Sequence, residues 1–244
     1  IDEALGMDKI YDILKYASSH DLYPDIRIIE SAVEPEIRIN GKTYLMFTSN
    51  NYLGLSTHPK VKEAAIKAIE KYGVGSTGSR LLSGNIDIHL QLEKKLAELK
   101  NGEDAIIFPT GFSANIGTIS AIMNPLKVTA SSFLSRKGVI LSDELNHASI
   151  IDGIKLSGQE KVVYKHCDLD HLEILLKKYK NRRKLIVTDS IFSMDGDIAP
   201  LDKISELAKK YNAMTMIDEA HAIGVLGKNG GGAMEHFNLK ITED

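Results

Sequence analysis

The sequence has 244 residues, which at about 150 residues per domain suits one large domain or one and a half small ones. There are 30 lysines and arginines against 33 aspartates and glutamates, a formal charge of −3 with no long run of one sign, which argues against a nucleic-acid arm or a polybasic membrane anchor. The apolar share of 43% is that of a globular protein, and no apolar run approaches the roughly 18 residues of a membrane-spanning helix. Cys167 is the one cysteine, so no internal disulfide forms and we expect a reducing, cytoplasmic location.

The first 48 residues differ in pattern from the rest of the chain. Apolar residues from Ile10 to Ala17 recur at helical spacing, and Asn40-Gly41 separates two short alternating segments, which is typical of a β-hairpin. We therefore expect an N-terminal arm with a small antiparallel β unit over residues 1–48, followed by a separate domain over residues 49–244.

From residue 49 onward, helical and strand patterns alternate. The predicted strands are short and apolar, and they comprise residues 105–108, 139–141, 161–164, 185–188 and 214–217. Helical patterns run from Val61 to Tyr72 and from His89 to Leu99, and further predicted helices comprise residues 114–122, 149–157, 172–179 and 201–211. Strands that alternate with helices pair in parallel, because a parallel connection needs a long crossover. The sequence thus predicts an α/β fold with a mostly parallel sheet and helices on both faces.

Two segments match known motifs but lack the structural context that each motif requires. Residues 73–78 match the dinucleotide fingerprint G-x-G-x-x-G, but they follow a predicted helix instead of a strand. Residues 218–221 spell the DEAH tetrapeptide of one helicase group, but the phosphate loop that a helicase needs is absent from the sequence.

Four polar segments follow predicted strands, where an open α/β sheet binds its ligands. Residues 109–115 form a glycine turn that opens a helix and suits a phosphate, although an ordinary capped turn explains them as well. Residues 143–149 and 189–196 carry imidazole and hydroxyl groups that a helix cap and a solvated loop would also explain. Asp218 follows an apolar strand, with His221 three residues on, and a carboxylate at the edge of a core requires a cationic partner.

Taken together, these segments offer a phosphate cradle, imidazole and hydroxyl donors, and an acid for a protonated heterocycle. This set suits pyridoxal phosphate (PLP), whose ring withdraws electrons when an acidic residue keeps its nitrogen protonated.

Several ordered motifs closely resemble those of the α-oxoamine synthases, which are fold type I PLP enzymes. The motifs are NNYLGL (50–55), GSTGSRLLSG (75–84), LNHAS (145–149), FSMDG (192–196) and DEAHAIGVLG (218–227). The likeness runs over about residues 47–237 and implies the PLP-binding large domain of that fold, with its C-terminal part and the small domain missing.

The resemblance implies PLP-binding functions for six residues: Gly111, Phe112, His147, Ser193, Asp218 and His221. The backbone N–H groups of Gly111 and Phe112 would bind the phosphate. His147 would be the catalytic residue that stacks on the ring and meets the substrate carboxylate. No metal ligand is implied.

The remaining functions implied by the resemblance concern the ring and the acyl substrate. Ser193 and His221 would donate to the phenolic oxygen of the ring, and Asp218 would pair with its nitrogen. Three further residues would line a thioester channel that lies partly across a homodimer interface: Asn50, Ser79 and Arg80.

The family condenses an amino acid with an acyl thioester, with loss of CO₂, to give an α-amino ketone. The sequences of residues 80–85 and 110–115 are most similar to those of the biotin-biosynthesis branch, which joins L-alanine to pimeloyl-CoA or a pimeloyl carrier protein. The branches that use glycine with an acetyl donor, or serine with a palmitoyl donor, remain alternatives. A non-catalytic partner subunit is an alternative of another class. No nucleic-acid or membrane partner is expected.

The sequence departs from the family at the lysine that binds PLP covalently, which lies in a Ser-Lys motif. Neither Lys228 nor Lys240 has that setting. We therefore expect the 244 residues by themselves to be an inactive part of an enzyme.

Overall fold

The structure is a computed structural model that describes residues 7–22, 26–124 and 137–239, the side chains of residues 7 and 8 excepted. Its contacts divide the chain into two units, Ile1–Glu70 and Lys71–Asp244, which are described separately below. The division of the sequence between residues 48 and 49 stays a prediction. Within the described ranges, no helix is long and apolar enough to span a bilayer.

The first unit contains the predicted hairpin. Its elements are α1 (Met7–Ser19), β1 (Glu36–Ile39), β2 (Lys42–Leu45) and the first part of α2 (Pro59–Tyr72). β1 and β2 pair antiparallel, and the turn residues Asn40 and Gly41 have φ of 51° and 71°. Two consecutive left-handed residues match the twist of the two strands, which explains why Asn-Gly predicts this turn correctly.

The second unit is built on a four-stranded sheet in which all strands are parallel, in the order β4-β3-β5-β6. The strands are β3 (Val139–Asp143), β4 (Glu160–Tyr164), β5 (Lys184–Asp189) and β6 (Met214–Asp218). The helices are α3 (Asp87–Lys100), α4 (Gly111–Met123), α5 (Ala148–Ser157), α6 (Leu169–Lys178), α7 (Leu201–Tyr211) and α8 (Ala233–His236). Four of the five predicted strands are confirmed, and three of them extend to an aspartate that the prediction placed outside the strand.

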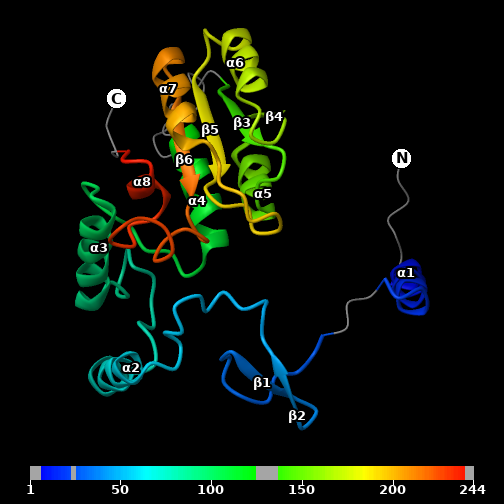
Figure 1. Ribbon diagram of the computed structural model, residues 1–244, viewed down its shortest axis with the longest axis vertical. Helices are drawn as coiled ribbons and strands as arrows, with labels where there is room; N and C mark the ends of the chain where they lie inside the picture. Colours follow the sequence, from blue (N-terminus) through cyan, green and yellow to red (C-terminus); the bar gives the residue numbers. More distant parts are fainter. Residues whose placement is uncertain (1–6, 23–25, 125–136, 240–244) are drawn as a thin grey trace. The chain divides into compact units, whose positions relative to one another are not determined.

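Helices cover both faces of this sheet, as predicted (Figure 1). Leu141 of β3 and Ile186 of β5 pack with α6 and α7 on one face. Ile140 and Leu185, the neighbouring residues in the same strands, pack with α4 and α5 on the other. Because successive strand residues point to opposite faces, a strand covered on both sides is apolar throughout.

The predicted strand over residues 105–108 is wrong. The segment has no regular secondary structure, and it joins no sheet in the described parts of the chain. Ile106 is 70% exposed, whereas Ile107 N–H donates to the Glu93 carboxylate at 2.9 Å. An apolar β-branched segment forms a strand only beside a partner strand, and the local pattern cannot show whether the partner is present.

The fragment from residue 73 to residue 78 follows α2, as the sequence indicated, so the dinucleotide interpretation stays excluded.

The close packing of α4 on α5 gives the first testable prediction. A Cβ added at Gly153 would lie 3.0 Å from Ile119 Cδ1 and 3.1 Å from the carbonyl oxygen of Asn115. Since a backbone carbonyl cannot easily move, the close contacts of Gly153→Ala should cost about 1–3 kcal/mol. The gain in helix propensity, about 1 kcal/mol, offsets part of this cost, so we expect the free energy of unfolding to fall by up to about 2 kcal/mol. Urea denaturation measures the change. Lys155→Ala on the exposed side of α5 is the control, and equal stability of the two variants would contradict the packing argument.

Candidate functional site

Three aspartates end three neighbouring strands of the sheet and define its carboxyl edge. Asp143 ends β3, Asp189 ends β5, and Asp218 ends β6. Asp189 and Asp218 are register partners, so they lie side by side. Asp143 and Asp189 are 1% and 7% exposed, and Asp218 is half-buried. Buried carboxylates require hydrogen-bond donors, so the neighbours of each one determine what it can do.

The Asp218 carboxylate is held by two neutral donors. Asn115 Nδ2 donates to Oδ2 at 2.9 Å, and the N–H of Ala220 donates to Oδ1 at 3.0 Å. Ser190 fixes the backbone at the same point, because its N–H and its hydroxyl both donate to the Asp218 carbonyl oxygen at 2.8 Å. The carboxylate is therefore oriented without being neutralised by these donors, which suits a cationic ligand.

A hydrogen-bonded chain runs from Asp218 to His147. Asn115, 5% exposed on α4, also donates to the Ser149 hydroxyl at 2.8 Å. That hydroxyl lies 2.7 Å from His147 Nδ1, which also accepts the N–H of Ser149 as the cap of α5. Because Nδ1 accepts from this N–H, we assign it as the acceptor of the hydroxyl too, which leaves the proton on Nε2. The exposed ring of His147 thus has a fixed orientation.

Asp189 anchors the backbone of His147. The N–H of His147 donates to Asp189 Oδ2 at 2.9 Å, and the N–H of Asp189 donates to Asn146 Oδ1 at 2.9 Å. Burial raises the pKa of the Asp189 carboxyl, the N–H of His147 opposes the shift, and the negative charge of Asp218 adds to it, so the pKa is about 6. Asp189 therefore titrates close to neutral pH beside Asp218.

The N-terminus of α4 is suited to an anion. Thr110 caps the helix by accepting the N–H of Ser113 at 3.0 Å. Gly111 and Phe112 lie in the first turn, where N–H groups have no partner inside the helix. A Cβ at Gly111 would meet no atom within 4 Å, so the space beside it is open. Free N–H groups and the helix dipole favour a phosphate here.

Two further predicted residues lie on turns beside this edge. Ser193 is exposed on the loop after β5, and His221 is half-buried in the turn after β6. Both follow strands whose last residues, Asp189 and Asp218, belong to the site. Their donation to a bound ring stays a prediction.

The predicted thioester residues have clear structural partners. Arg80 forms a two-pronged ion pair with the carboxylate of Glu93, in which Nη2 lies 2.9 Å from Oε2, and its Nε donates to Asn85. Arg80, together with the N–H of Ile107, lowers the pKa of Glu93 to about 2. The Ser79 carbonyl oxygen accepts two N–H groups of its own turn.

Asn50 belongs to the first unit, where its Oδ1 lies 3.4 Å from the Tyr52 hydroxyl. The function of Asn50, Ser79 and Arg80 in binding an acyl thioester stays a prediction.

Sequence reasoning missed Asn115 and Asp189 as site residues. Asp189 directly follows a predicted strand, so the rule that led to Asp218 could have found it. Asn115 gave a weaker signal, because its partners Ser149 and Asp218 are 34 and 103 residues away.

Comparisons with known proteins place the chain among PLP enzymes. Residues 42–242 match the family described as aminotransferase class I and II. An 8-amino-7-oxononanoate synthase of Alkaliphilus metalliredigens is 52% identical over 89% of the chain and 53% of its own length. The 8-amino-7-oxononanoate synthase of Thermoanaerobacter pseudethanolicus is 48% identical over 96% of the chain and 57% of its own length. A solved serine palmitoyltransferase from S. paucimobilis, with a PLP–myriocin compound bound, is 32% identical with a TM-score of 0.84.

These matches confirm the expected α/β fold with a parallel sheet. The solved structure covers 98% of this chain, which in turn covers 58% of that protein. The chain therefore spans little more than half the length of the proteins that it matches.

The raised pKa of Asp189 gives a prediction about pH. The folded chain binds this proton more tightly than the unfolded chain, whose pKa is the ordinary 3.8. The stability that this group contributes is therefore present at low pH and is lost as the pH rises towards about 6, by about 3 kcal/mol.

Asp189→Asn keeps an acceptor for the N–H of His147 but cannot ionise. We expect the variant to gain stability relative to the parent chain as the pH rises from about 4 to about 7. Urea denaturation at each pH measures this difference. Asp152→Asn, at an exposed carboxylate on α5, should show no such trend. A pH-independent difference for Asp189→Asn would refute the assigned titration.

Proposed function

Because the chain belongs to the aminotransferase class I and II family, we propose that the carboxyl edge of its sheet binds PLP. The observation that carries the proposal is the Asp218 carboxylate, which is oriented by Asn115 and Ala220 beside the open N-terminus of α4. An oriented carboxylate and a phosphate site are the two polar anchors that a protonated pyridine phosphate requires.

The side chains fit the group in chemistry. Gly111 and Phe112 offer N–H groups to the phosphate, and Asp218 offers its charge to the ring nitrogen. The exposed imidazole of His147, fixed by Ser149, offers a flat surface for stacking. When bound, PLP supplies an electron sink that stabilises negative charge at the α-carbon of an amino acid.

Residues of the chain would keep the ring of bound PLP in the state in which it withdraws electrons. Asp218 would hold a proton on the ring nitrogen, and Asn115 keeps the Asp218 carboxylate oriented. Ser193 and His221 would donate to the phenolic oxygen. His147 would cover one face of the ring and exclude water from it, with its Nε2–H available to the substrate carboxylate.

The reaction that we propose for the complete protein is the decarboxylative condensation of L-alanine with a pimeloyl thioester, the reaction of 8-amino-7-oxononanoate synthase in biotin biosynthesis. Relatives with that name are 48–52% identical to the chain. Serine palmitoyltransferase is the alternative, supported by a solved structure at 32% identity. Glycine C-acetyltransferase and a non-catalytic partner subunit are further alternatives.

Further parts of the proposal concern the complete protein. Asn50, Ser79 and Arg80 line the thioester channel, the protein is a homodimer, and it is located in the cytoplasm. Lys228 is exposed in the turn before α8, away from any Ser-Lys motif, and Lys240 lies outside the described residues. The 244 residues by themselves are therefore expected to bind PLP without a covalent bond and to be inactive.

The pairing of Asp218 with the ring predicts the effect of removing its charge. Asp218→Asn keeps the shape of the side chain but replaces a charge-assisted hydrogen bond, so the dissociation constant of PLP should rise about tenfold or more. Equilibrium titration by PLP absorbance measures this without turnover. Asp152→Asn is the matched control. Equal affinity of the Asp218→Asn variant and the parent chain would contradict the pairing.

The reaction is tested with the product of the complete gene. We expect CO₂ release with L-alanine and pimeloyl-CoA or a pimeloyl carrier protein, and growth of biotin-requiring cells on biotin-free medium. Preference for serine with palmitoyl-CoA, or for glycine with acetyl-CoA, would replace the proposed substrates. Absence of activity with all three pairs would favour the partner subunit.

A further inference from the structure

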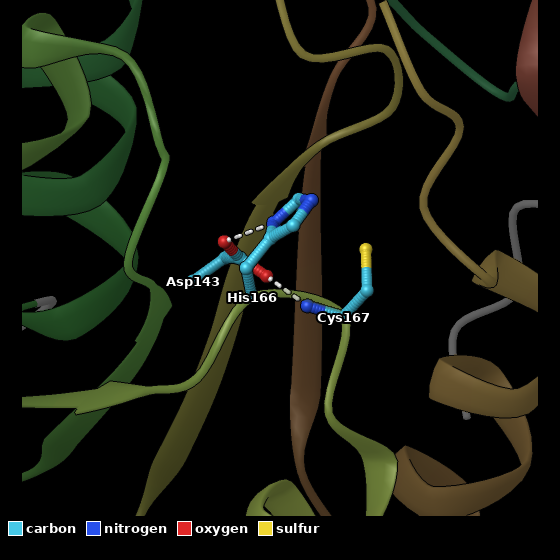
Figure 2. Close-up of side chains that lie close together, drawn as sticks. All are labelled: Asp143, His166 and Cys167. Atoms are coloured by element: carbon cyan, nitrogen blue, oxygen red, sulfur yellow. Dashed lines mark hydrogen bonds and ion pairs between the residues drawn. The ribbon is translucent and has the colours of Figure 1, made fainter. Parts of the chain in front are cut away.

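A cluster of three different ligand types lies at the other end of the carboxyl edge, next to β4. Asp143, His166 and Cys167 each offer an atom, an oxygen, a nitrogen and a sulfur, and these atoms lie within 4.8 Å of one another (Figure 2). Asp143 ends β3, and β5 lies between β3 and β6, so one strand separates the cluster from Asp218. It does not depend on the proposed function.

The three side chains are held before any ligand arrives. Asp143 is 1% exposed, and its two oxygens accept the N–H groups of Leu145 and Cys167 at 3.0 and 2.9 Å. The backbone N–H of His166 donates to the carboxylate of Glu144 at 2.8 Å. Figure 2 shows the imidazole and the thiol projecting to the same side of their turn. A site that is already ordered loses little conformational entropy when it binds.

Carboxylates flank the imidazole and the thiol of the cluster. His166 lies between two carboxylates, with Nδ1 2.9 Å from Asp143 and Nε2 2.7 Å from Asp197. Partial burial alone would lower its pKa, but the hydrogen bonds to Asp143 and Asp197 raise it overall. Burial and the same two carboxylates raise the pKa of the Cys167 thiol to about 12. The carboxylates of Asp143 and Asp197 place negative charge next to both side chains, which favours a bound cation.

We propose that Asp143, His166 and Cys167 bind one borderline divalent cation, with Zn²⁺ as the representative ion, because their oxygen, nitrogen and sulfur atoms converge on one point. Thiolate, imidazole and carboxylate are the ligands that Zn²⁺ takes in proteins, whereas Ca²⁺ and Mg²⁺ require oxygen ligands. The ring nitrogen of His166 that does not bind the ion keeps a carboxylate partner, as metal-bound histidines usually do.

Exchange of one thiol proton and one imidazolium proton for one Zn²⁺ conserves the net charge of the cluster. Two carboxylates, an imidazolium and a thiol have a net charge of −1. Two carboxylates, a neutral imidazole, a thiolate and one Zn²⁺ also have a net charge of −1. Binding therefore releases up to two protons, one from the thiol and one from the imidazolium, and no oxidant or reductant takes part.

The ion would also order a neighbouring loop. Asp197, which lies 3.9 Å from the Cys167 sulfur, belongs to the loop after β5. The same loop carries Ser193. A cation bound by Asp143, His166 and Cys167 would thus hold the turn after β4 in place, and through Asp197 it would also order the loop after β5.

The test titrates the purified metal-free chain with Co²⁺, a coloured substitute for Zn²⁺. Because Cys167 is the one cysteine, a thiolate-to-cobalt band in the near ultraviolet reports this site alone. We expect the band to appear at one Co²⁺ per chain, to disappear when Zn²⁺ is added, and to be accompanied by proton release.

Cys167→Ala is the decisive variant, because it removes one ligand and leaves the hydrogen bonds of His166 to Asp143 and Asp197 intact. We expect it to melt like the parent chain without metal and to bind Zn²⁺ about 100-fold more weakly. His20→Gln, at an exposed histidine of the first unit, should bind like the parent. Absence of the band in the parent chain, or Zn²⁺ affinity that Cys167→Ala leaves unchanged, would overturn the proposal.

Discussion

The Asp218 carboxylate lies at the end of an apolar strand and receives hydrogen bonds from neutral groups, and the site depends on this one arrangement. A half-buried carboxylate is stable there because Asn115 and Ala220 replace part of its hydration. The same two donors fix the direction of its free lone pairs. The strand supplies the position, α4 supplies the orientation, and neither neutralises the charge, which leaves it available to a cationic ring.

The three strand-end aspartates show how neighbours give one residue type different functions. Asp218 has neutral donors and keeps its charge available. Asp189 is buried beside Asp218, which together with burial raises its pKa to about 6, and it holds the backbone of His147. Asp143 is enclosed by the turn of His166 and Cys167. The parallel sheet brings all three to one edge, although they are far apart in the sequence.

The elements that depend on local interactions were predictable from local patterns in the sequence. The Asn40-Gly41 turn, the helix over residues 201–211 and four strands follow from backbone preference and periodicity. Residues 105–108 have the same apolar pattern as those strands but pair with no strand among the residues that the structure describes. The site residues next to strand ends were predictable for a similar reason, because the sheet's topology places them. Asn115 was not, since its function arises from contacts across 34 and 103 residues.

The most direct test of the account is ¹⁵N NMR of PLP labelled at its ring nitrogen and bound to the chain. The Asp218 carboxylate should hold a proton on that nitrogen at neutral pH, and Asp218→Asn should release it, which moves the ¹⁵N resonance to the position of free pyridine nitrogen. An unprotonated nitrogen in the parent chain, or the same resonance in both proteins, would contradict the central claim.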